Sequence, residues 1–224
     1  MTQDTLARTE FFDFDTPEMS RFVARSLAGS GDSQREQAVA LFYAVRDGLL
    51  YEIYNADFAP EDMRSSAILR KGAGLCIHKS IVYASALRSI GIPARLWFTD
   101  VRNHLCSDQL ARLMGDKTFH YHCLVSLNLD GRWIKATPVF NKRLCQLFRM
   151  RPLDFDGQSD CVHHPFDDEG RQHMEVLRDH GEFDDLPHDM ILSGLRQKHA
   201  SLFATPTKFQ SGSLRRDAMS VTAM

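Results

Sequence analysis

The chain has 224 residues, a formal net charge of −2 and 43% hydrophobic residues, which suits one globular domain of ordinary size or two small ones. The small net charge excludes a broad electrostatic surface for nucleic acid or for an anionic membrane. The polar, acidic N-terminus lacks the apolar region of a signal peptide, and no apolar run approaches the ~18 residues of a membrane span. We therefore expect a cytoplasmic protein without a nucleic-acid or membrane partner.

Two helices are predicted near the N-terminus. Thr16-Pro17-Glu18 has the cap, the N1 proline and the acidic first turn of a helix start, and this helix should run to about Ala28. A second, stronger helix begins after Asp32. Its apolar residues recur at helical spacing and predict a face in the core: Ala38, Leu41, Phe42, Val45 and Leu49.

The stretch Lys71–Ser80, KGAGLCIHKS, organises the rest of the chain. Gly72 and Gly74 precede Cys76, and the run that follows contains no glycine or proline until Gly91. This pattern predicts a flexible loop that delivers a thiol to the first turn of a helix. A helix N-terminus presents free N–H groups and a partial positive charge, which favour a thiolate over a thiol. The stretch therefore predicts a reactive cysteine.

The cysteines are odd in number, widely spaced and without a CxxC pair. In a reducing compartment we expect free thiols, most of them packed as small buried hydrophobes. They are Cys76, Cys106, Cys123, Cys145 and Cys161.

A strand and a hairpin follow the cysteine helix. Residues 94–101 are rich in Trp, Phe, Thr and Val, which predicts a strand. Asp130-Gly131 stands between the strand-like runs 122–129 and 132–137. An Asp-Gly pair in this setting is a strong signal of a two-residue hairpin turn.

Counting back from the turn sets the register of the hairpin. Asn128 then faces Trp133, and Leu124 faces Thr137. Thr137 becomes a diagonal neighbour of His122, within ~7–8 Å, which is close enough to orient the imidazole. The other face of the first strand is apolar and predicts the core face: Cys123, Val125, Leu127 and Leu129.

The pattern weakens beyond Pro138. We expect mostly ordered loop over 150–187, a helix over 186–203 and a disordered tail over 205–224. No shift in composition justifies a domain boundary. We therefore expect a single domain over 1–204 with an α+β fold, in which N-terminal helices and a central helix carrying Cys76 pack on a small antiparallel sheet.

These motifs, in their order, resemble the transglutaminase-like superfamily of papain-type cysteine enzymes. The matching pieces are AVRDGLLY at 44–51, GLCIHKS at 74–80, ALRSIGIPAR at 86–95, and His122 followed by DGRW at 130–133. The resemblance covers about 35–140. It implies a papain/transglutaminase-like fold, a nucleophilic Cys76 and a catalytic His122.

The chain departs from this family at the third catalytic position. Where the family carries an aspartate, this chain has Thr137. A threonine accepts a hydrogen bond from a histidine Nδ1–H but supplies no charge to stabilise an imidazolium. Three outcomes stay open: Cys76 and His122 work with a neutral Thr137, another acid such as Asp100 or Asp156 completes the site, or catalysis has been lost.

The resemblance implies acyl transfer. The Cys76 thiolate would attack an amide or thioester carbonyl, His122 would protonate the leaving group, and the Cys76 N–H would meet the oxyanion. The acyl-enzyme would then pass to water, as in an amidase or peptidase, or to an amine, as in a transglutaminase or N-acyltransferase. We expect a peptide, protein or small amide substrate, and no cofactor or metal.

Several alternatives accompany this interpretation. His120 becomes the functional histidine if the register slips by two. Trp97, Asn103 and His104 are candidates for binding substrate in the cleft. A non-catalytic binding module on the same fold is an alternative function, and Thr137 motivates it.

A zinc-binding protein is a minor alternative. One group of nitrogen and sulfur ligands of the zinc type lies on a predicted strand and a second lies at the start of the cysteine helix, although their spacing matches no standard structural zinc pattern. These residues are His120, His122, Cys123, Cys76 and His78.

Overall fold

The sheet that supports the site has four antiparallel strands in the order β5-β4-β3-β6. The computed structural model describes residues 4–104, 111, 116–147, 151–162, 174–214 and 216. This sheet with helices packed on it confirms the predicted α+β class. Its strands are β3 (Ala94–Asn103), β4 (Thr118–Leu129), β5 (Arg132–Ala136) and β6 (Met174–Phe183).

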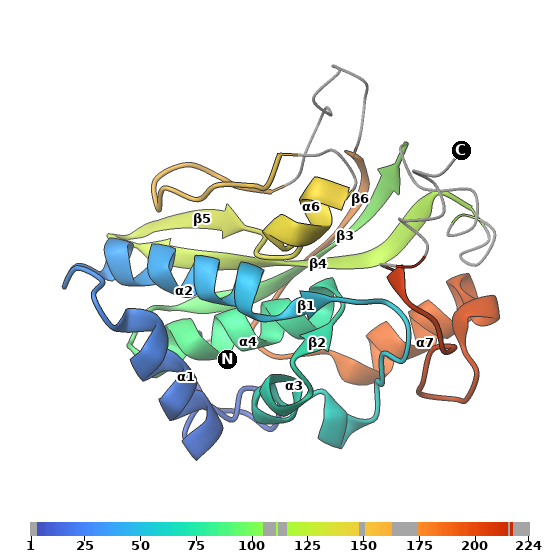
Figure 1. Cartoon of the computed structure of the whole chain (residues 1–224), viewed down its shortest axis with the longest axis horizontal. Helices are drawn as coiled ribbons and strands as arrows, with labels where there is room; N and C mark the ends of the chain where they lie inside the picture. The colour runs from blue at the N-terminus through green and yellow to red at the C-terminus, as the bar shows by residue number, and fades with distance from the viewer. Residues whose placement is uncertain are drawn as a thin grey trace.

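The helices α1, α2 and α4 gather on one side of this sheet, and α7 lies at the end of the molecule away from the β4–β5 turn (Figure 1). A two-stranded parallel sheet of β1 (Leu50–Tyr51) and β2 (Ala73–Gly74) ties the end of α2 to the loop ahead of α4. The helices are α1 (Pro17–Leu27), α2 (Gln34–Gly48), α3 (Ser65–Lys71), α4 (Cys76–Ser89), α6 (Lys142–Leu147) and α7 (His188–Lys198), with short 3-10 helices η1 (Pro60–Asp62) and η2 (Ala200–Leu202).

Helix α4 is the central helix, and its side chains are buried from Ile77 to Arg88. It has no solvent-facing stripe because the sheet covers one side and the N-terminal helices cover the other. Several of its polar side chains bond to backbone carbonyls of neighbouring elements. The Tyr83 hydroxyl donates to Ala38 O at 3.0 Å, and the Ser80 hydroxyl donates to Cys123 O at 3.0 Å.

The predicted hairpin register is confirmed. Leu129 pairs with Arg132, and Asn128 pairs with Trp133. The predicted core face of β4 is buried, as expected. The ladder ends at the pair of Val125 and Ala136, so Thr137 lies beyond the last residue of β5.

Two expectations for the C-terminal third were wrong. Residues 174–183, expected in a loop, form β6 at the edge of the sheet. An edge strand keeps polar residues and a glycine, and this composition hid it in the sequence. Residues 205–214, expected in a disordered tail, are ordered because Phe209 and Leu214 are buried in the core.

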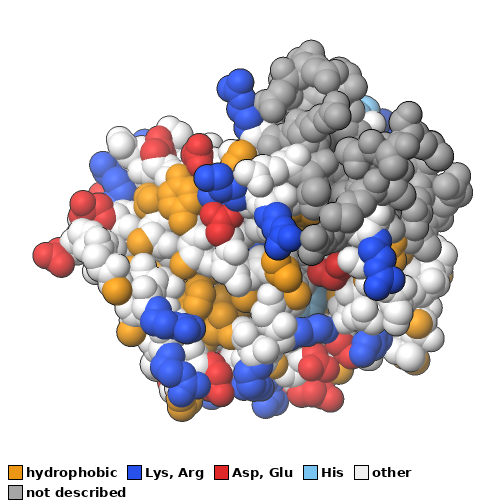
Figure 2. Space-filling view, viewed as in Figure 1, with side chains coloured by type: hydrophobic (Ala, Val, Ile, Leu, Met, Phe, Trp, Pro, Cys, Tyr) orange, Lys and Arg blue, Asp and Glu red, His pale blue; other side chains and the backbone are white. Residues whose placement is uncertain are grey.

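Acidic and basic side chains are interspersed on the face shown in Figure 2, as the small net charge leads one to expect. Among the described residues, no helix combines the length and the apolarity that crossing a membrane requires.

Candidate active site

Cys76 is the first residue of α4, as predicted, but the loop that carries it is not flexible. Gly74 pairs with Tyr51 in the β1–β2 sheet. Gly72 ends α3 in the left-handed conformation, with φ of 70°, where glycine carries no steric penalty. The thiol therefore stands on a segment held by backbone pairing rather than on a mobile loop.

His78 locks the start of α4. Its Nδ1 accepts the Leu75 N–H at 3.3 Å, and its Nε2–H donates to Asp57 O at 3.0 Å. A Cβ on Gly74 would stand 2.6 Å from the His78 Cβ, so the close approach of the loop requires glycine there. Burial lowers the pKa of His78 to about 4. His78 is thus a neutral structural residue, and both of its ring nitrogens are engaged.

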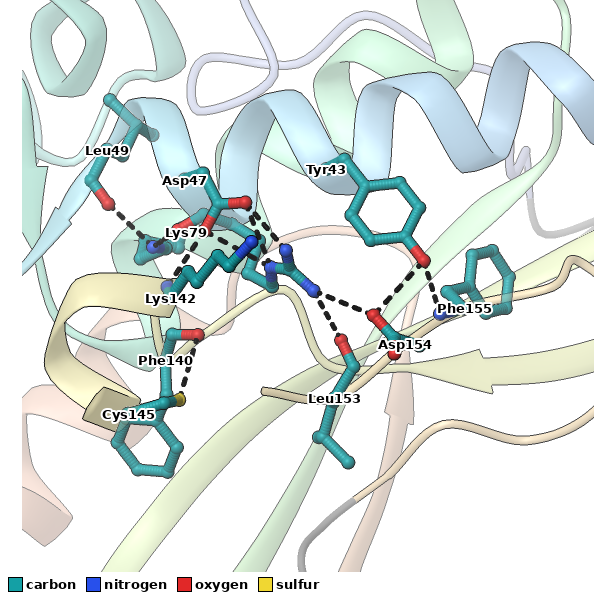
Figure 3. A network of polar contacts seen from close by, with 11 residues as sticks. Tyr43, Asp47, Leu49, Lys79, Phe140, Lys142, Cys145, Leu153, Asp154 and Phe155 are labelled. Carbon is teal, nitrogen blue, oxygen red and sulfur yellow. Dashed lines mark hydrogen bonds and ion pairs between the residues drawn. The ribbon is translucent and has the colours of Figure 1, made fainter. Parts of the chain in front are cut away.

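Helix α4 is also anchored to α2 by Lys79. Its Nζ is fully buried and donates to the carbonyls of Arg46 at 2.8 Å and Leu49 at 2.7 Å (Figure 3). These carbonyls belong to the end of α2, where helical carbonyls lack partners within the helix. Arg46 itself bonds to Asp47 and Asp154. This network fixes the position of the Cys76 helix relative to α2.

The environment of the Cys76 thiol corrects one expectation. Burial raises its pKa to about 11, although the N–H groups of Cys123, Ile77 and Cys76 itself act to lower it. Desolvation thus outweighs the helix start, and the helix terminus alone does not hold a thiolate near neutral pH. Cys76 needs a proton acceptor beside it to act as a nucleophile.

Such acceptors stand in the cavity at the start of α4, which has a volume of about 50 Å³. Cys76 is partly exposed, and it shares this cavity with two histidines from β4 and one from the residue that follows α7. The remaining lining is apolar or aromatic, and the described lining residues include no Lys, Arg, Asp or Glu. The full lining is Tyr51, Ile53, Leu75, Cys76, Ile77, Phe119, His120, Tyr121, His122, Leu195, His199, Leu202 and Phe209.

The structure therefore brings two of the three predicted catalytic residues to one cavity. His122, on β4, is buried and lies opposite Thr99 of β3. Thr137 does not appear among the described residues of the lining. Its hydroxyl donates to Val162 O at 2.7 Å, which ties the end of β5 to the following segment.

The predicted substrate-binding residues also lie outside the described lining. The Trp97 Nε1–H donates to Asp179 at 2.7 Å, and the Lys135 ammonium lies over its ring at 3.5 Å. His104 pairs with Glu175 at 3.1 Å, and Asn103 is the last residue of β3. A role for these residues in binding substrate stays a prediction.

The two acids named as alternatives differ sharply in position. Asp156 is exposed, and its carboxylate accepts the N–H groups of Gln158 and Ser159 in a surface turn. Asp100 is buried on β3 and contacts His120 Nδ1 at 3.1 Å. Asp100 is therefore the acid that reaches a histidine of the cavity.

Sequence reasoning missed the C-terminal wall of the cavity. Leu195 and His199 reach it from α7 and its end, and Leu202 and Phe209 follow. The signal was present only in part, as an apolar face on a predicted helix, because no motif links that helix to Cys76. The His199 Nε2 accepts the His120 N–H at 3.3 Å, which joins this wall to β4.

No group of three or more His, Cys, Asp or Glu is placed to hold a metal ion within the part of the chain that the structure describes. The free cysteines in that part are Cys76, Cys123, Cys145 and Cys161, and Cys106 lies outside it.

The family model of the transglutaminase-like superfamily matches residues 21–138. The match includes Cys76 and His122 and ends before α7. Among solved structures, the chain is similar to one named "a Putative Cysteine Protease from Cytophaga hutchinsonii", with a TM-score of 0.45 and 13% sequence identity over 80% of this chain and 52% of that chain. The chain thus spans about half the length of that protein. No curated protein matches it.

Proposed function

The chain belongs to the transglutaminase-like superfamily, and we propose that it is a cysteine-dependent enzyme that transfers or hydrolyses the acyl group of an amide or a related compound. The observation that carries the proposal is the cavity in which a thiol at a helix start meets His120, His122 and His199. A thiol whose pKa is raised to about 11 gains a nucleophilic form at neutral pH when an adjacent imidazole takes its proton.

The reaction begins with transfer of the Cys76 proton to a histidine of the cavity, a role for which the family resemblance implies His122. The sulfur attacks the carbonyl carbon, and the oxyanion accepts a hydrogen bond from the Cys76 N–H at the helix start. The imidazolium returns its proton to the leaving amine as the carbon–nitrogen bond breaks. Water or an amine then attacks the acyl-enzyme, and the thiol is regenerated.

The lining of the cavity indicates the kind of acyl group. The described lining offers aliphatic and aromatic side chains together with histidines, and it includes no Lys, Arg, Asp or Glu to pair with a charged acyl group. A small, neutral, apolar acyl group fits this surface best, because burying an unpaired charge there is costly.

The test is acyl transfer from a small activated ester. We expect p-nitrophenyl acetate to be turned over by the wild-type protein and the Cys76→Ala variant to lose this activity by about 10²-fold or more. Cys145→Ala is the matched control, because Cys145 is a buried free cysteine outside the described lining of the cavity. An added primary alkylamine, which is a weaker nucleophile than hydroxylamine, separates the two outcomes, since an acyl-transfer enzyme forms the N-alkylacetamide and a hydrolase forms acetate.

Alkylation provides a readout that needs no substrate. Iodoacetamide at pH 6, followed by peptide mapping, should label Cys76 faster than Cys145 and Cys161. Equal labelling of the three, together with unchanged ester turnover in Cys76→Ala, would remove the nucleophile and favour a non-catalytic binding module on the same fold.

A further inference from the structure

Strand β4 carries one extra residue beside the cavity. Thr99 of β3 pairs with His122, whereas Asp100 stands opposite both His120 and Tyr121. Tyr121 has a left-handed backbone conformation, with φ of 57°, which a bulky side chain adopts rarely. Such strain persists where the surrounding structure enforces it and is frequent at functional sites.

The extra residue changes which face His120 occupies. The irregularities of the sheet lie in β4 and β6, so β3 itself alternates without a break and Asp100 shares the face of Phe98 and Leu96. Both of those residues are fully buried and belong to the hydrophobic core. His120 contacts Asp100 on this face, whereas His122 pairs with Thr99 on the alternate face. His120 and His122 therefore lie on different faces of β4, although residues two apart in a regular strand share a face.

The Asp100 carboxylate collects three donors. His180 Nε2–H donates to it at 2.7 Å, the Tyr121 N–H at 3.0 Å and His120 Nδ1–H at 3.1 Å. Burial acts to raise the pKa of this carboxyl, but these hydrogen bonds outweigh it and the pKa is lowered. Asp100 thus places a negative charge in contact with His120, which lines the Cys76 cavity.

We propose that Asp100 and His120 form the histidine–carboxylate couple of this site, with His120 as the residue that exchanges the proton with Cys76. The proposal rests on the proposed function of Cys76 and goes beyond it by naming both members of the couple. Asp100 acts through His120 and is a positioning residue. It supplies the negative charge that the family places at the position of Thr137.

The chemistry of the couple follows from the hydrogen bonds. Because Nδ1–H is committed to Asp100, proton exchange with Cys76 and with the leaving group falls to Nε2 of His120. The Asp100 charge stabilises the imidazolium that forms when the Cys76 proton is taken. No net charge is created in the cavity by this step, since thiolate and imidazolium appear together.

Two further histidines contact this couple, and Arg178 of β6 is the cross-strand partner of Asp100. His180 of β6 shares Asp100 and stacks on the Tyr121 ring with centroids 4.6 Å apart. His199, after α7, accepts the His120 N–H, and its ring lies 5.3 Å from that of His120. Both groups hold His120 in place, and His180 competes for the same carboxylate.

The experiment measures the rate of Cys76 alkylation by iodoacetamide from pH 5 to pH 10, followed by peptide mapping, in the wild type and in five variants. In Asp100→Asn we expect the midpoint of the pH–rate profile to move up by about one pH unit or more, because loss of the negative charge disfavours the thiolate–imidazolium pair. In His120→Gln we expect the rate at pH 7 to fall by about 10²-fold. His104→Gln is the matched control, because His104 is also a histidine paired with a carboxylate but lies outside the described lining of the cavity.

His122→Gln decides between the two histidines. A profile that moves in Asp100→Asn and a rate that falls in His120→Gln support the couple, as does rescue of the midpoint by Asp100→Glu. A wild-type midpoint retained in Asp100→Asn, or a rate retained in His120→Gln while His122→Gln loses it, overturns the proposal. If Asp100→Asn does not fold, the two histidine variants settle the choice. Wild-type Cys76 that alkylates no faster than Cys145 is a different result, because it removes the proposed function itself.

Discussion

His78 shows how one residue beside the nucleophile can be structural rather than catalytic. It lies two residues after Cys76, but its ring is committed to the Leu75 N–H and the Asp57 carbonyl. Its neighbour Gly74 leaves room for this ring to approach the loop. His78 and Gly74 together fix the glycine-rich segment that precedes Cys76. The thiol is therefore held in position without a bound substrate.

The burial of His78 predicts a pH effect on stability. Its pKa is lowered to about 4 in the folded protein, against about 6.5 in an unfolded chain. Between these values the unfolded state binds the proton and the folded state does not, so the free energy of unfolding falls as the pH falls from 6.5 to 4. We expect wild type to lose about 3 kcal/mol more than His78→Gln over this range in urea unfolding. Parallel curves for the two proteins would contradict this assignment.

Among the elements, the contact of α7 with β4 bears most directly on the site, because residues of both line the cavity of Cys76. Gly194 of α7 faces the Tyr121 ring so closely that a Cβ there would overlap it. Tyr121 belongs to the irregular segment of β4 that also carries His120. The packing of one helix is therefore coupled to the geometry of the proposed acid–base couple.

Gly194→Ala should disturb both the fold and the site. The added methyl group displaces the Tyr121 ring, and overpacking of this kind costs about 1 to 3 kcal/mol. We expect thermal denaturation to show this loss and the alkylation of Cys76 at pH 7 to slow. Gly48→Ala is the matched control, because a Cβ at that helical position meets nothing within 4 Å, and it should leave both measurements close to those of the wild type.

At the scale of the whole molecule, a segment close to the C-terminus packs against the site and lines part of its cavity. Phe209 packs against Phe58 and Phe203, with ring centroids 4.9 and 4.6 Å away, and it lines the cavity of Cys76. The backbone of this segment bonds to the loop after β1, where the Asn55 N–H donates to Gln210 O. Residues far beyond the family motifs thus decide the size of the cavity.

Truncation of Phe209 should therefore change acyl preference as well as stability. We expect Phe209→Ala to lower the free energy of unfolding by about 3 kcal/mol and to raise the turnover of p-nitrophenyl butyrate relative to the acetate ester. Phe22→Ala is the control, because Phe22 is buried in α1 away from the described lining. An equal butyrate-to-acetate ratio in the two variants would show that Phe209 does not bound the acyl group.

Much of the local structure could be predicted because it depends on neighbours in the sequence. The Asp130-Gly131 turn determined the register of β4 and β5, and the Gly–Cys stretch marked the start of α4. The pairing of β6 could not be predicted, since an edge strand carries little apolar alternation. The order of residues 205–214 was hidden in the same way, because a few apolar anchors such as Phe209 hold a polar segment.

By itself, the sequence determined the position of the thiol at a helix start, the hairpin and the family, since each is written in short-range spacing. Only the tertiary structure decided which polar groups meet that thiol and whether it ionises. The raised pKa of Cys76 comes from burial by segments distant in the chain, and the contact of Asp100 with His120 comes from one extra residue in β4. Desolvation and cross-strand contact both depend on residues that are distant in the chain and meet only in the folded molecule. The spacing of residues along the sequence therefore does not predict them.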